Sequence, residues 1–415
     1  MKIAILGFGK EGKSVFRFLK KSPRYNGADI SILDKKRDER YLAHLDAFDL
    51  IVKSPGVPFT LPEVAKARAS GALFTSATAL FFDHAQGLII GITGTKGKGT
   101  TATLLHKMLA ACKKDTCLAG NIGLSMLDIL PNLHEESITV LELSSFQLEH
   151  LLFSPRIAVV LDIFPDHLDA HASYKEYVAA KKGIVENQTK NDAVFFFEGS
   201  AEAEAIARQS KGKHLAIDPE AFRLFKARDL KMPGAHNYRN AVMAASVALY
   251  LGCDPVRVKK EAHSFKGLPY RLQRVRSVNT VSFYNDSAAT NPHATAAAIM
   301  SFETPSILIA GGRDKGFPYD VLAKVAVKSH LRHVVAVGEN AKILEKIFSK
   351  AGVPLTIQPL LDKAVEMAWR YCSKQQKGQE QWNIIFSPGA TSFDQFENYK
   401  ERGRAFNRIV KELKI

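Results

Sequence analysis

The feature that most constrains the fold of this sequence is a short apolar run that ends in a glycine or polar turn and leads into a helical pattern. This succession recurs along the chain, for example at KIAILGFGKEG, GLIIGITG and SILIAGG. Strands that alternate with helices in this way predict an α/β fold built on doubly wound parallel sheets. Because 415 residues are too many for one hydrophobic core, we expect three domains, at residues 1–85, 86–267 and 268–415.

The composition is that of an ordinary globular protein. Hydrophobic residues make up 46% and charged residues 24% of the chain, and we find no apolar run of membrane-spanning length. Four scattered cysteines lack disulfide or zinc-site spacing, which favours a reducing cytoplasm. The net charge of +15 suits anionic partners, but the lysines are dispersed along the chain. A solvated basic surface or an anionic small-molecule substrate therefore explains the charge better than a nucleic-acid groove.

The first glycine loop has the spacing G-x-G-x-x-G. Gly7, Gly9 and Gly12 directly follow the apolar run KIAIL, and Asp34 ends the next predicted strand. This arrangement is typical of a dinucleotide-binding turn, in which the acidic residue binds a ribose hydroxyl. A tight strand-to-helix turn with no ligand has the same glycines, so both interpretations stay open.

A second glycine loop, GITGTKGKGT at 91–100, resembles a phosphate-binding loop but departs from the usual spacing. Position 92 holds no glycine, and Gly99 follows Lys98 where a hydroxyl residue is usual. Backbone N–H groups of 94–101 could still hold phosphate oxygens at the start of the following helix. Lys98 would reach the terminal phosphates, and Thr100 or Thr101 would supply a hydroxyl for phosphate or magnesium. We therefore predict ATP here, with a lysine-rich turn as the alternative.

Three further residues are candidates for a magnesium site beside this loop. Glu142 and His167 each follow an apolar run, and parallel strands bring such positions to one edge of a sheet. Hard oxygen ligands there would suit Mg²⁺ and a γ-phosphoryl group. Lys181 lies near the middle of an apolar helical stripe, whereas Lys182 lies off it. A core or capping histidine and a lysine at the edge of the stripe are the structural alternatives.

Together these motifs resemble the Mur ligase family, and most closely its D-glutamate-adding members. The resemblance covers nearly the whole chain. Its motifs are SPG at 54–56, GTKGKGTT at 94–101, GNIG at 120–123, ELSSFQL at 142–148, PDHLD at 165–169, YVAAK at 177–181, HNYRN at 236–240, GLPYRLQ at 267–273, NDSAATNP at 285–292, GGRDKG at 311–316 and SPGATSFDQFENYKERG at 387–403.

The resemblance implies a Rossmann-like N-terminal domain, a central ATP-binding domain with the phosphate loop, and a Rossmann-like C-terminal domain. It also implies roles for individual residues. For the UDP part of the substrate they are Gly7, Gly9, Lys10, Gly12, Asp34, Lys35, Ser54 and Gly56, with Asn121 on the muramoyl-alanine part. For ATP they are Gly94, Thr95, Lys96, Gly97, Lys98, Gly99, Thr100, Thr101, Asn237, Arg271 and Asp286. For D-glutamate they are Thr290, Lys315, Ser392 and Tyr399. For magnesium they are Thr100, Glu142, His167 and Lys181, the last as a carbamate; Lys98, Glu142, His167 and Lys181 would form the catalytic cluster.

The implied reaction is ATP-driven amide formation in the cytoplasm, by a monomer that uses ATP and Mg²⁺. The carboxylate of UDP-N-acetylmuramoyl-L-alanine would take the γ-phosphoryl group, and the amine of D-glutamate would displace phosphate from the acyl phosphate. Three positions depart from the family pattern: Ala288 replaces a lysine, Asp162 an asparagine and Gly99 a hydroxyl residue. We expect altered nucleotide affinity with activity retained. The nearest alternative is another Mur ligase or a folylpolyglutamate synthase. An NAD-dependent oxidoreductase would use only the first glycine loop, and a nucleic-acid-stimulated ATPase would use only the second.

Overall fold

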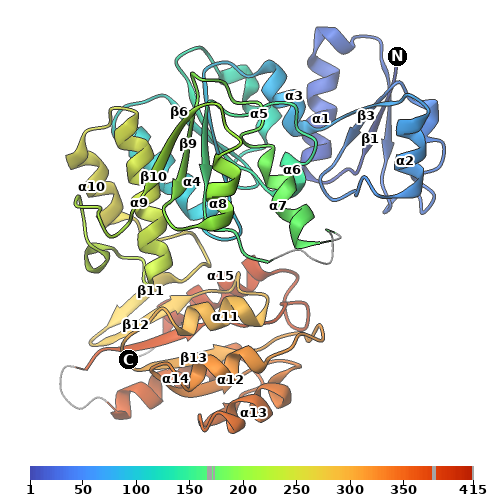
Figure 1. Ribbon diagram of the computed structural model, residues 1–415. Coiled ribbons are helices and arrows are strands. Elements are labelled where there is room, and N and C mark those ends of the chain that lie inside the picture. Colours follow the sequence, from blue (N-terminus) through green and yellow to red (C-terminus); the bar gives the residue numbers. More distant parts are fainter. Residues whose placement is uncertain (166–170, 172, 376–379, 414–415) are drawn as a thin grey trace. The chain divides into compact units, whose positions relative to one another are not determined.

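The computed structural model describes residues 1–165, 171, 173–375 and 380–413 and divides the chain into two compact units (Figure 1). Unit 1 comprises Met1–Leu224 and Arg239–Ala262, and unit 2 comprises Phe225–Tyr238 and His263–Ile415. Helix α9 (Ala235–Tyr250) contributes to both units. Unit 1 contains two parallel sheets and unit 2 contains a mainly parallel one, so the predicted α/β class is confirmed.

The first sheet of unit 1 has the order β2-β1-β3-β4 with all strands parallel. Alternate residues of β1 enter different cores: Ile3 and Ile5 pack on one face, Ala4 and Leu6 on the other. Both faces are therefore covered, as is usual for parallel sheets. Its strands are β1 (Lys2–Leu6), β2 (Asp29–Leu33), β3 (Leu50–Lys53) and β4 (Leu73–Thr75), and its helical segments are α1 (Lys10–Lys21), η1 (Pro23–Tyr25), η2 (Leu45–Ala47), α2 (Pro62–Ala69) and α3 (Ala77–His84).

The second sheet of unit 1 is also fully parallel, in the order β10-β9-β8-β5-β7-β6. After β5 the chain forms β6 and β7 on one side of this strand. It later forms β8, β9 and β10 on the other side. The carboxyl end of β5 therefore lies at a topological switch point, where parallel sheets bind ligands. The strands are β5 (Leu88–Thr93), β6 (Thr116–Gly120), β7 (Ile138–Glu142), β8 (Ile157–Val160), β9 (Ala193–Phe197) and β10 (Lys213–Ile217).

The helices around this second sheet include the one that follows the phosphate loop. The buried face of α4 presents Leu104, Leu105, Met108 and Leu109, which are completely buried. Besides α9, the helical segments are α4 (Lys98–Ala111), α5 (Met126–Ile129), η3 (Leu130–Asn132), α6 (Ser145–Leu148), α7 (Tyr174–Lys182), α8 (Ala201–Ala207) and α10 (Pro255–Ser264).

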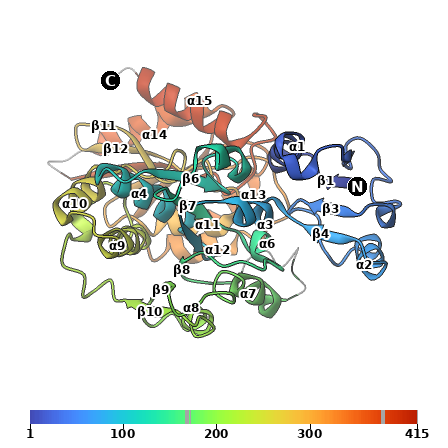
Figure 2. The same cartoon turned by 90° about the horizontal axis from the view of Figure 1, so that it is seen from above.

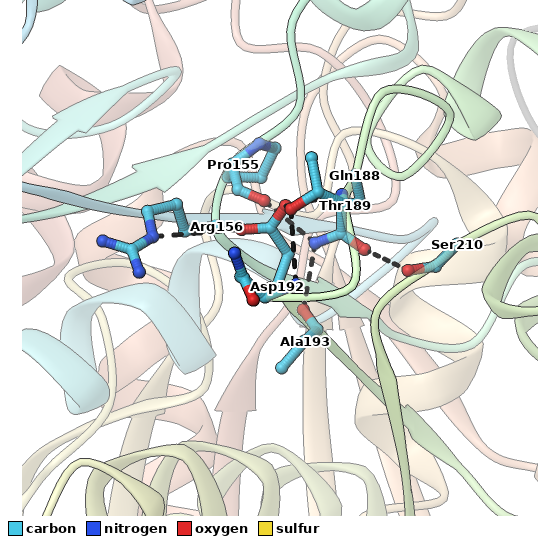
Figure 3. Close-up of polar contacts among 8 residues, drawn as sticks. Pro155, Arg156, Gln188, Thr189, Asp192, Ala193 and Ser210 are labelled. Carbon is cyan, nitrogen blue, oxygen red and sulfur yellow. Dashed lines mark hydrogen bonds and ion pairs between the residues drawn. The ribbon is translucent and has the colours of Figure 1, made fainter.

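The amino ends of β8, β9 and β10 are joined by a buried network around one glutamine (Figure 3). The Nε2 of Gln188 donates to the carbonyls of Pro155 and Ala193 at 2.9 and 3.0 Å. Its Oε1 accepts a hydrogen bond from Ser210 Oγ at 2.6 Å. Beside it, Asp192 accepts hydrogen bonds from Thr189 at a surface turn. The network around Gln188 consists of neutral groups, and it uses both amide hydrogens and the oxygen of Gln188 within the chain.

The sheet of unit 2 has the order β11-β12-β16-β13-β14-β15, and its edge strand β11 runs antiparallel to β12. The expectation of parallel strands is therefore wrong at this edge, because a short turn joins β11 directly to β12 and leaves no room for a crossover helix. Its strands are β11 (Gln273–Val278), β12 (Val281–Asn285), β13 (Ser306–Ala310), β14 (Leu331–Ala336), β15 (Leu355–Ile357) and β16 (Trp382–Phe386).

The helices of unit 2 cover both faces of its sheet and can be followed by their orange and red colours in Figure 2. Residues of α11, α12 and α13 share one core with β14, whereas residues of α14 and α15 share a second core with β16. The segments are η4 (Ala227–Asp229), α11 (Pro292–Ile299), α12 (Asp320–Ala326), α13 (Ala341–Lys350), α14 (Leu361–Gln375) and α15 (Tyr399–Glu412). Among the described residues, no helix is both long and apolar enough to cross a bilayer.

Candidate active site

The phosphate loop between β5 and α4 has a shape that only glycine permits at two positions. Gly94 has φ +147° and Gly97 has φ +86°. A Cβ on Gly94 would approach the Leu161 side chain to 2.7 Å, and one on Gly97 would approach Asn240 Oδ1 to 2.2 Å. Helix α4 begins at Lys98, so Gly99 and the following threonines lie in its first turn. The loop therefore presents a helix N-terminus at the end of the central strand, as an anion site requires.

Two lysine side chains meet at one carbonyl oxygen of this loop. Lys98 Nζ donates to the carbonyl oxygens of Gly94 and Thr95 at 2.9 and 3.0 Å. Lys181 Nζ donates to the same Gly94 oxygen at 3.2 Å, although Lys181 and Gly94 are 87 positions apart in the sequence. Lys181 is 1% exposed and its Nζ lies 4.5 Å from the centroid of the Tyr177 ring. The prediction that Lys181 faces inward is confirmed, and Lys182 is only partly buried.

Glu142 is the last residue of β7 and pairs with Ile92 of β5, two residues before Gly94. It is 6% exposed, and the backbone N–H of Asn121 donates to its carbonyl oxygen at 3.0 Å. The carboxylate, the predicted substrate contact Asn121 and the phosphate loop thus belong to neighbouring strand ends. His167, the fourth predicted member of the cluster, lies outside the described residues.

Thr95 joins the loop to the segment that follows β8. Its hydroxyl donates to Phe164 O at 3.0 Å and accepts from Phe164 N at 2.9 Å, and it lies 3.0 Å from the Tyr177 hydroxyl. The backbone N–H of Thr95 donates to Asp162 O at 2.9 Å. The hydrogen bonds of Thr95 therefore hold the loop against the segment after β8, in keeping with its low exposure of 6%.

The departure at Asp162 has a partner in the same unit. Arg239 donates to both carboxylate oxygens of Asp162, with Nη2 at 2.9 Å from each. The guanidinium also lies over the Phe197 ring, 4.0 Å from its centroid. An asparagine could not form this two-oxygen contact with a cation, so Asp162 and Arg239 form a matched pair.

Above the first sheet, the loop at 7–12 is shaped by hydrogen bonds within the chain. Gly7 has φ +91°, and a Cβ on Gly12 would lie 2.1 Å from the Gly7 carbonyl oxygen. Asp34 Oδ2 accepts from the Phe8 backbone N–H at 2.6 Å, and this bond lowers the pKa of the Asp34 carboxyl. Ser54 Oγ donates to Gly7 O at 3.0 Å.

The remaining predicted substrate contacts of unit 1 differ in environment. Lys10 Nζ donates to Gly123 O at 2.9 Å, which links the first glycine loop to the GNIG segment. Gly9 and Gly56 face open space, because a Cβ on either would meet no atom within 4 Å. Lys35 is exposed. The structure therefore brings the segments at 7–12 and 120–123 together.

In unit 2, Asp286 is a buried carboxylate at the end of β12. Its oxygens accept from Ser387 Oγ at 2.7 Å and from Leu272 N at 3.1 Å. Burial raises the pKa of Asp286 to about 7, opposed by these hydrogen bonds and by Arg271. Asn237 is buried and its Nδ2 donates to Pro233 O at 2.7 Å. These are the three ATP-side residues predicted outside the loop.

A buried arginine joins segments that contain three of the residues predicted for D-glutamate. Ser287 Oγ donates to the carbonyl of Tyr399, the first residue of α15, at 2.9 Å. Arg402 donates to Ser287 and to Ala390 O, and so holds the NDS and SPGATS segments together. Ser392, two residues beyond Ala390, is 2% exposed. Thr290 is partly buried and Lys315 is exposed.

Sequence reasoning missed two buried charged residues and a third that is partly buried. Arg402 is 3% exposed and lies four positions before buried Phe406 on α15, so helical spacing could have revealed it. Lys53 is 4% exposed at the end of a buried strand, and Glu11 lies within the first glycine motif. In the part of the chain that the structure describes, no three His, Cys, Asp or Glu residues gather as a metal cluster.

The parallel sheet with a glycine loop and lysine at its switch point defines an α/β nucleotide-binding protein. Residues 92–228 match the Mur ligase middle domain, and residues 270–378 match the Mur ligase glutamate ligase domain. The chain belongs to the Mur ligase family, whose members are ATP-dependent ligases. The prediction of the family is thereby confirmed.

Curated relatives match the chain over nearly its full length. A protein of Acetivibrio thermocellus named UDP-N-acetylmuramoylalanine–D-glutamate ligase is 34% identical over 99% of this chain and 96% of its own length. A protein of the same name from Symbiobacterium thermophilum is 33% identical over 90% of this chain and 86% of its own.

Solved structures share the fold at lower identity. The UDP-N-acetylmuramate–alanine ligase of Thermotoga maritima has a TM-score of 0.58 and 17% identity over 100% of both chains. A folylpolyglutamate synthase from the same organism has a TM-score of 0.54 and 13% identity, over 75% of this chain and 90% of its own. These likenesses support the fold, and the choice of substrate depends on the sequence relatives.

Proposed function

We propose that this chain uses ATP to join D-glutamate to UDP-N-acetylmuramoyl-L-alanine during synthesis of peptidoglycan precursors. The observation that carries the proposal is the match, over 99% of the chain, to a relative named for that reaction. The folylpolyglutamate synthase likeness covers less of the chain and shares only 13% of residues, so it favours the fold without favouring that substrate.

The phosphate loop supports the ATP half of the reaction. In our proposal, backbone N–H groups of residues 94–101 hold ATP phosphates, and Lys98 moves from its carbonyl partners to the terminal phosphates. The start of α4 adds the positive end of a helix dipole. Electrostatic stabilisation of this kind is the main contribution a protein makes to phosphoryl transfer.

Magnesium is the metal that the family implies, and the donors here suit it. Mg²⁺ prefers one or two carboxylates together with hydroxyl or water oxygens and substrate phosphates. Glu142 supplies a buried carboxylate at the strand end and Thr100 a hydroxyl in the first turn of α4. Bound Mg²⁺ would supply charge neutralisation for the transferred phosphoryl group. We propose Thr100, Glu142, His167 and a carbamylated Lys181 as the residues that hold it.

The contact between Lys181 and the loop supports that modification. Unmodified, two ammonium groups approach one carbonyl oxygen, which places like charges close together. A carbamate on Lys181 would replace this repulsion by attraction to Lys98. It would also add two hard oxygen atoms to a site otherwise poor in carboxylates.

The chain's residues would then carry the reaction in two stages. Lys98 would hold the γ-phosphate in line with the alanyl carboxylate while that carboxylate takes the phosphoryl group from ATP and ADP leaves. The amine of D-glutamate would attack the acyl phosphate, lose a proton and expel phosphate. Asp34, Lys10 and Asn121 would orient the nucleotide sugar.

The second substrate would bind in unit 2. We assign the D-glutamate carboxylates to Lys315, Ser392, Thr290 and Tyr399, where an ammonium and hydroxyl groups suit a dicarboxylate. Asn237, Arg271 and Asp286 would contact ATP. We also propose that the protein is a cytoplasmic monomer with domains at 1–85, 86–267 and 268–415. These points rest on the family resemblance.

A phosphate-release assay tests the whole proposal. The full chain is incubated with ATP, Mg²⁺ and UDP-N-acetylmuramoyl-L-alanine, and each reaction receives one amino acid from a panel. Phosphate release that requires D-glutamate is expected, with L-glutamate, L-lysine and L-alanine as matched controls. Release with another amino acid, or with a folate in place of the nucleotide sugar, would overturn the assignment.

A further inference from the structure

The first glycine loop is joined to the segment after Glu142 by a hydrogen bond between two side chains. Gln147 Nε2 donates to Glu11 Oε1 at 2.8 Å, across 136 positions of sequence. Gln147 is 3% exposed, and its Oε1 accepts from the Ser144 backbone N–H and hydroxyl at 3.0 and 3.1 Å. The bond from Ser144 N and a second one, in which Gln147 N donates to Ser144 Oγ at 3.3 Å, form the capping box of α6. Glu11 therefore fixes the side chain that caps α6.

A buried lysine, Lys53, favours the charged form of Glu11. Lys53 Nζ is held by Val57 O at 2.7 Å and lies 4.2 Å from the centroid of the Phe59 ring. Burial lowers the pKa of Lys53 to about 8, while Glu149 and Glu11 act in the opposite direction. Burial raises the pKa of Glu11, while Gln147, Lys10 and Lys53 oppose that rise. Each group thus favours the charged form of the other.

The carboxylate keeps one costly feature. Glu11 Oε2 is buried and accepts no hydrogen bond from the residues that the structure describes. A glutamine or leucine would remove that buried charge, and buried polar atoms without a partner usually have a functional reason. The position of Glu11 supplies one, because its side chain joins the loop at 7–12, to which it belongs, to the segment at 142–148.

We propose that Glu11, supported by Lys53, is a positioning residue that holds the nucleotide-sugar loop at 7–12, the SPG segment and the cap of α6 in one arrangement. The inference rests on the proposed function, in which these segments contact the nucleotide sugar and precede the phosphate-transfer residues. Glu11 would act through Gln147, and its loss would let α6 and the strand end at Glu142 move relative to the substrate.

Hydrogen exchange tests the link without any substrate. In the free full-length chain, Glu11→Leu is expected to raise amide exchange in the peptide covering residues 144–150 at least tenfold. Glu11→Gln keeps an oxygen that accepts from Gln147 and is expected to leave that exchange within twofold of the parent. Glu63→Leu is the matched control, because Glu63 is an exposed acid in the first turn of α2. Unchanged exchange in Glu11→Leu would overturn the proposal.

Steady-state kinetics tests its consequence for the reaction. We expect Glu11→Leu to lower kcat about tenfold and to raise the KM for the nucleotide sugar, with the KM for ATP within twofold. Glu11→Gln should restore kcat to within threefold of the parent. Equal kinetics in both variants would overturn the positioning role. A parent chain that shows no D-glutamate-dependent turnover would refute the proposed function, and the exchange experiment would still decide the link.

The pH profile separates charge compensation from packing. Above about pH 8 Lys53 loses its proton, so its ammonium is expected to shape the alkaline limb of kcat. Because Glu11 favours the protonated lysine, Glu11→Gln should shift this limb to lower pH. Lys10 and Glu149 also act on this pair, and His150 and Arg68 lie against the Phe59 ring beside Lys53; all four are left unchanged in the variant. An alkaline limb that stays in place would remove Lys53 from the proposal.

Discussion

The two ends of the central sheet hold their polar groups in opposite ways. At the amino ends, Gln188 uses both amide hydrogens and its oxygen within a neutral, buried network. At the carboxyl ends, Lys98 and Lys181 direct two ammonium groups at the carbonyl of Gly94. The Gln188 network is satisfied by hydrogen bonds within the chain and needs no ligand. The lysine pair concentrates charge at a helix N-terminus, where a phosphate would exchange weak carbonyl contacts for stronger ones.

The contrast teaches how burial should be interpreted. Gln188 and Lys181 are both almost completely buried, at 2% and 1% exposure. Burial alone therefore does not distinguish a structural side chain from a catalytic one. The distinguishing property is charge: a neutral amide satisfied by carbonyls stabilises the fold, whereas a buried ammonium costs free energy that only a partner or a modification offsets. Substitutions at the two ends should accordingly separate stability from turnover.

The largest effect is expected at Lys98. Lys98→Ala removes the cation proposed to hold the γ-phosphate and should lower kcat about a thousandfold. The free energy of unfolding should change by less than about 1 kcal/mol, because the side chain is only partly buried. Phosphate release and urea unfolding measure the two quantities. If a loss of stability in Lys98→Ala accounted for the lost turnover, the two ends of the sheet would not differ in the way we propose.

Lys181 and its neighbour form the next comparison. Lys181→Met keeps an unbranched apolar stem but removes the ammonium that reaches Gly94, and it should lower kcat about a hundredfold. Lys182→Met, one position away and off the buried stripe, should stay within twofold. Single-turnover phosphate release measures both. Similar losses in the two variants would show that helix α7, and not the Lys181 ammonium, is responsible.

Gln188 should give the reverse pattern. Gln188→Leu leaves the carbonyls of Pro155 and Ala193 and the hydroxyl of Ser210 without their partner, at a cost of about 2 kcal/mol in unfolding free energy. The KM for ATP and kcat should remain within twofold at 20 °C, where the variant is still folded. Thermal unfolding and steady-state kinetics check this. A lower kcat at full occupancy of the folded state would mean that the two ends are coupled.

The smallest effect is expected at Asp162. Its side chain and that of Arg239 are 28% and 33% exposed, so their pair resembles a surface ion pair. Asp162→Asn should reduce the unfolding free energy by about 0.5 kcal/mol. The backbone bond from Thr95 to Asp162 O is unaffected, so the KM for ATP should rise no more than about threefold. Arg239→Gln in the same background should add little, because the pair is already broken.

Local patterns in the sequence were sufficient for the elements and for several features of the site. The apolar runs ending in glycine predicted β1, β5 and β13, and the helical patterns after the first two runs predicted α1 and α4. Helical periodicity separated buried Lys181 from Lys182 because both signals lie within a few turns of one helix. The antiparallel strand β11 escaped prediction, since QRVRSV has no apolar run to mark it.

The sequence by itself therefore determined the parallel α/β class, the glycine loops and the residue types available for phosphate chemistry. Only the tertiary structure decided that Lys98 and Lys181 share one carbonyl, that Arg239 binds Asp162 and that Gln147 binds Glu11. These contacts join residues 77 to 136 positions apart, apart from the short step from Lys98 to Gly94. Periodicity indicates which face of a helix or strand is buried. Which element packs against that face depends on the order of strands in the sheet, and packing across the whole unit sets that order.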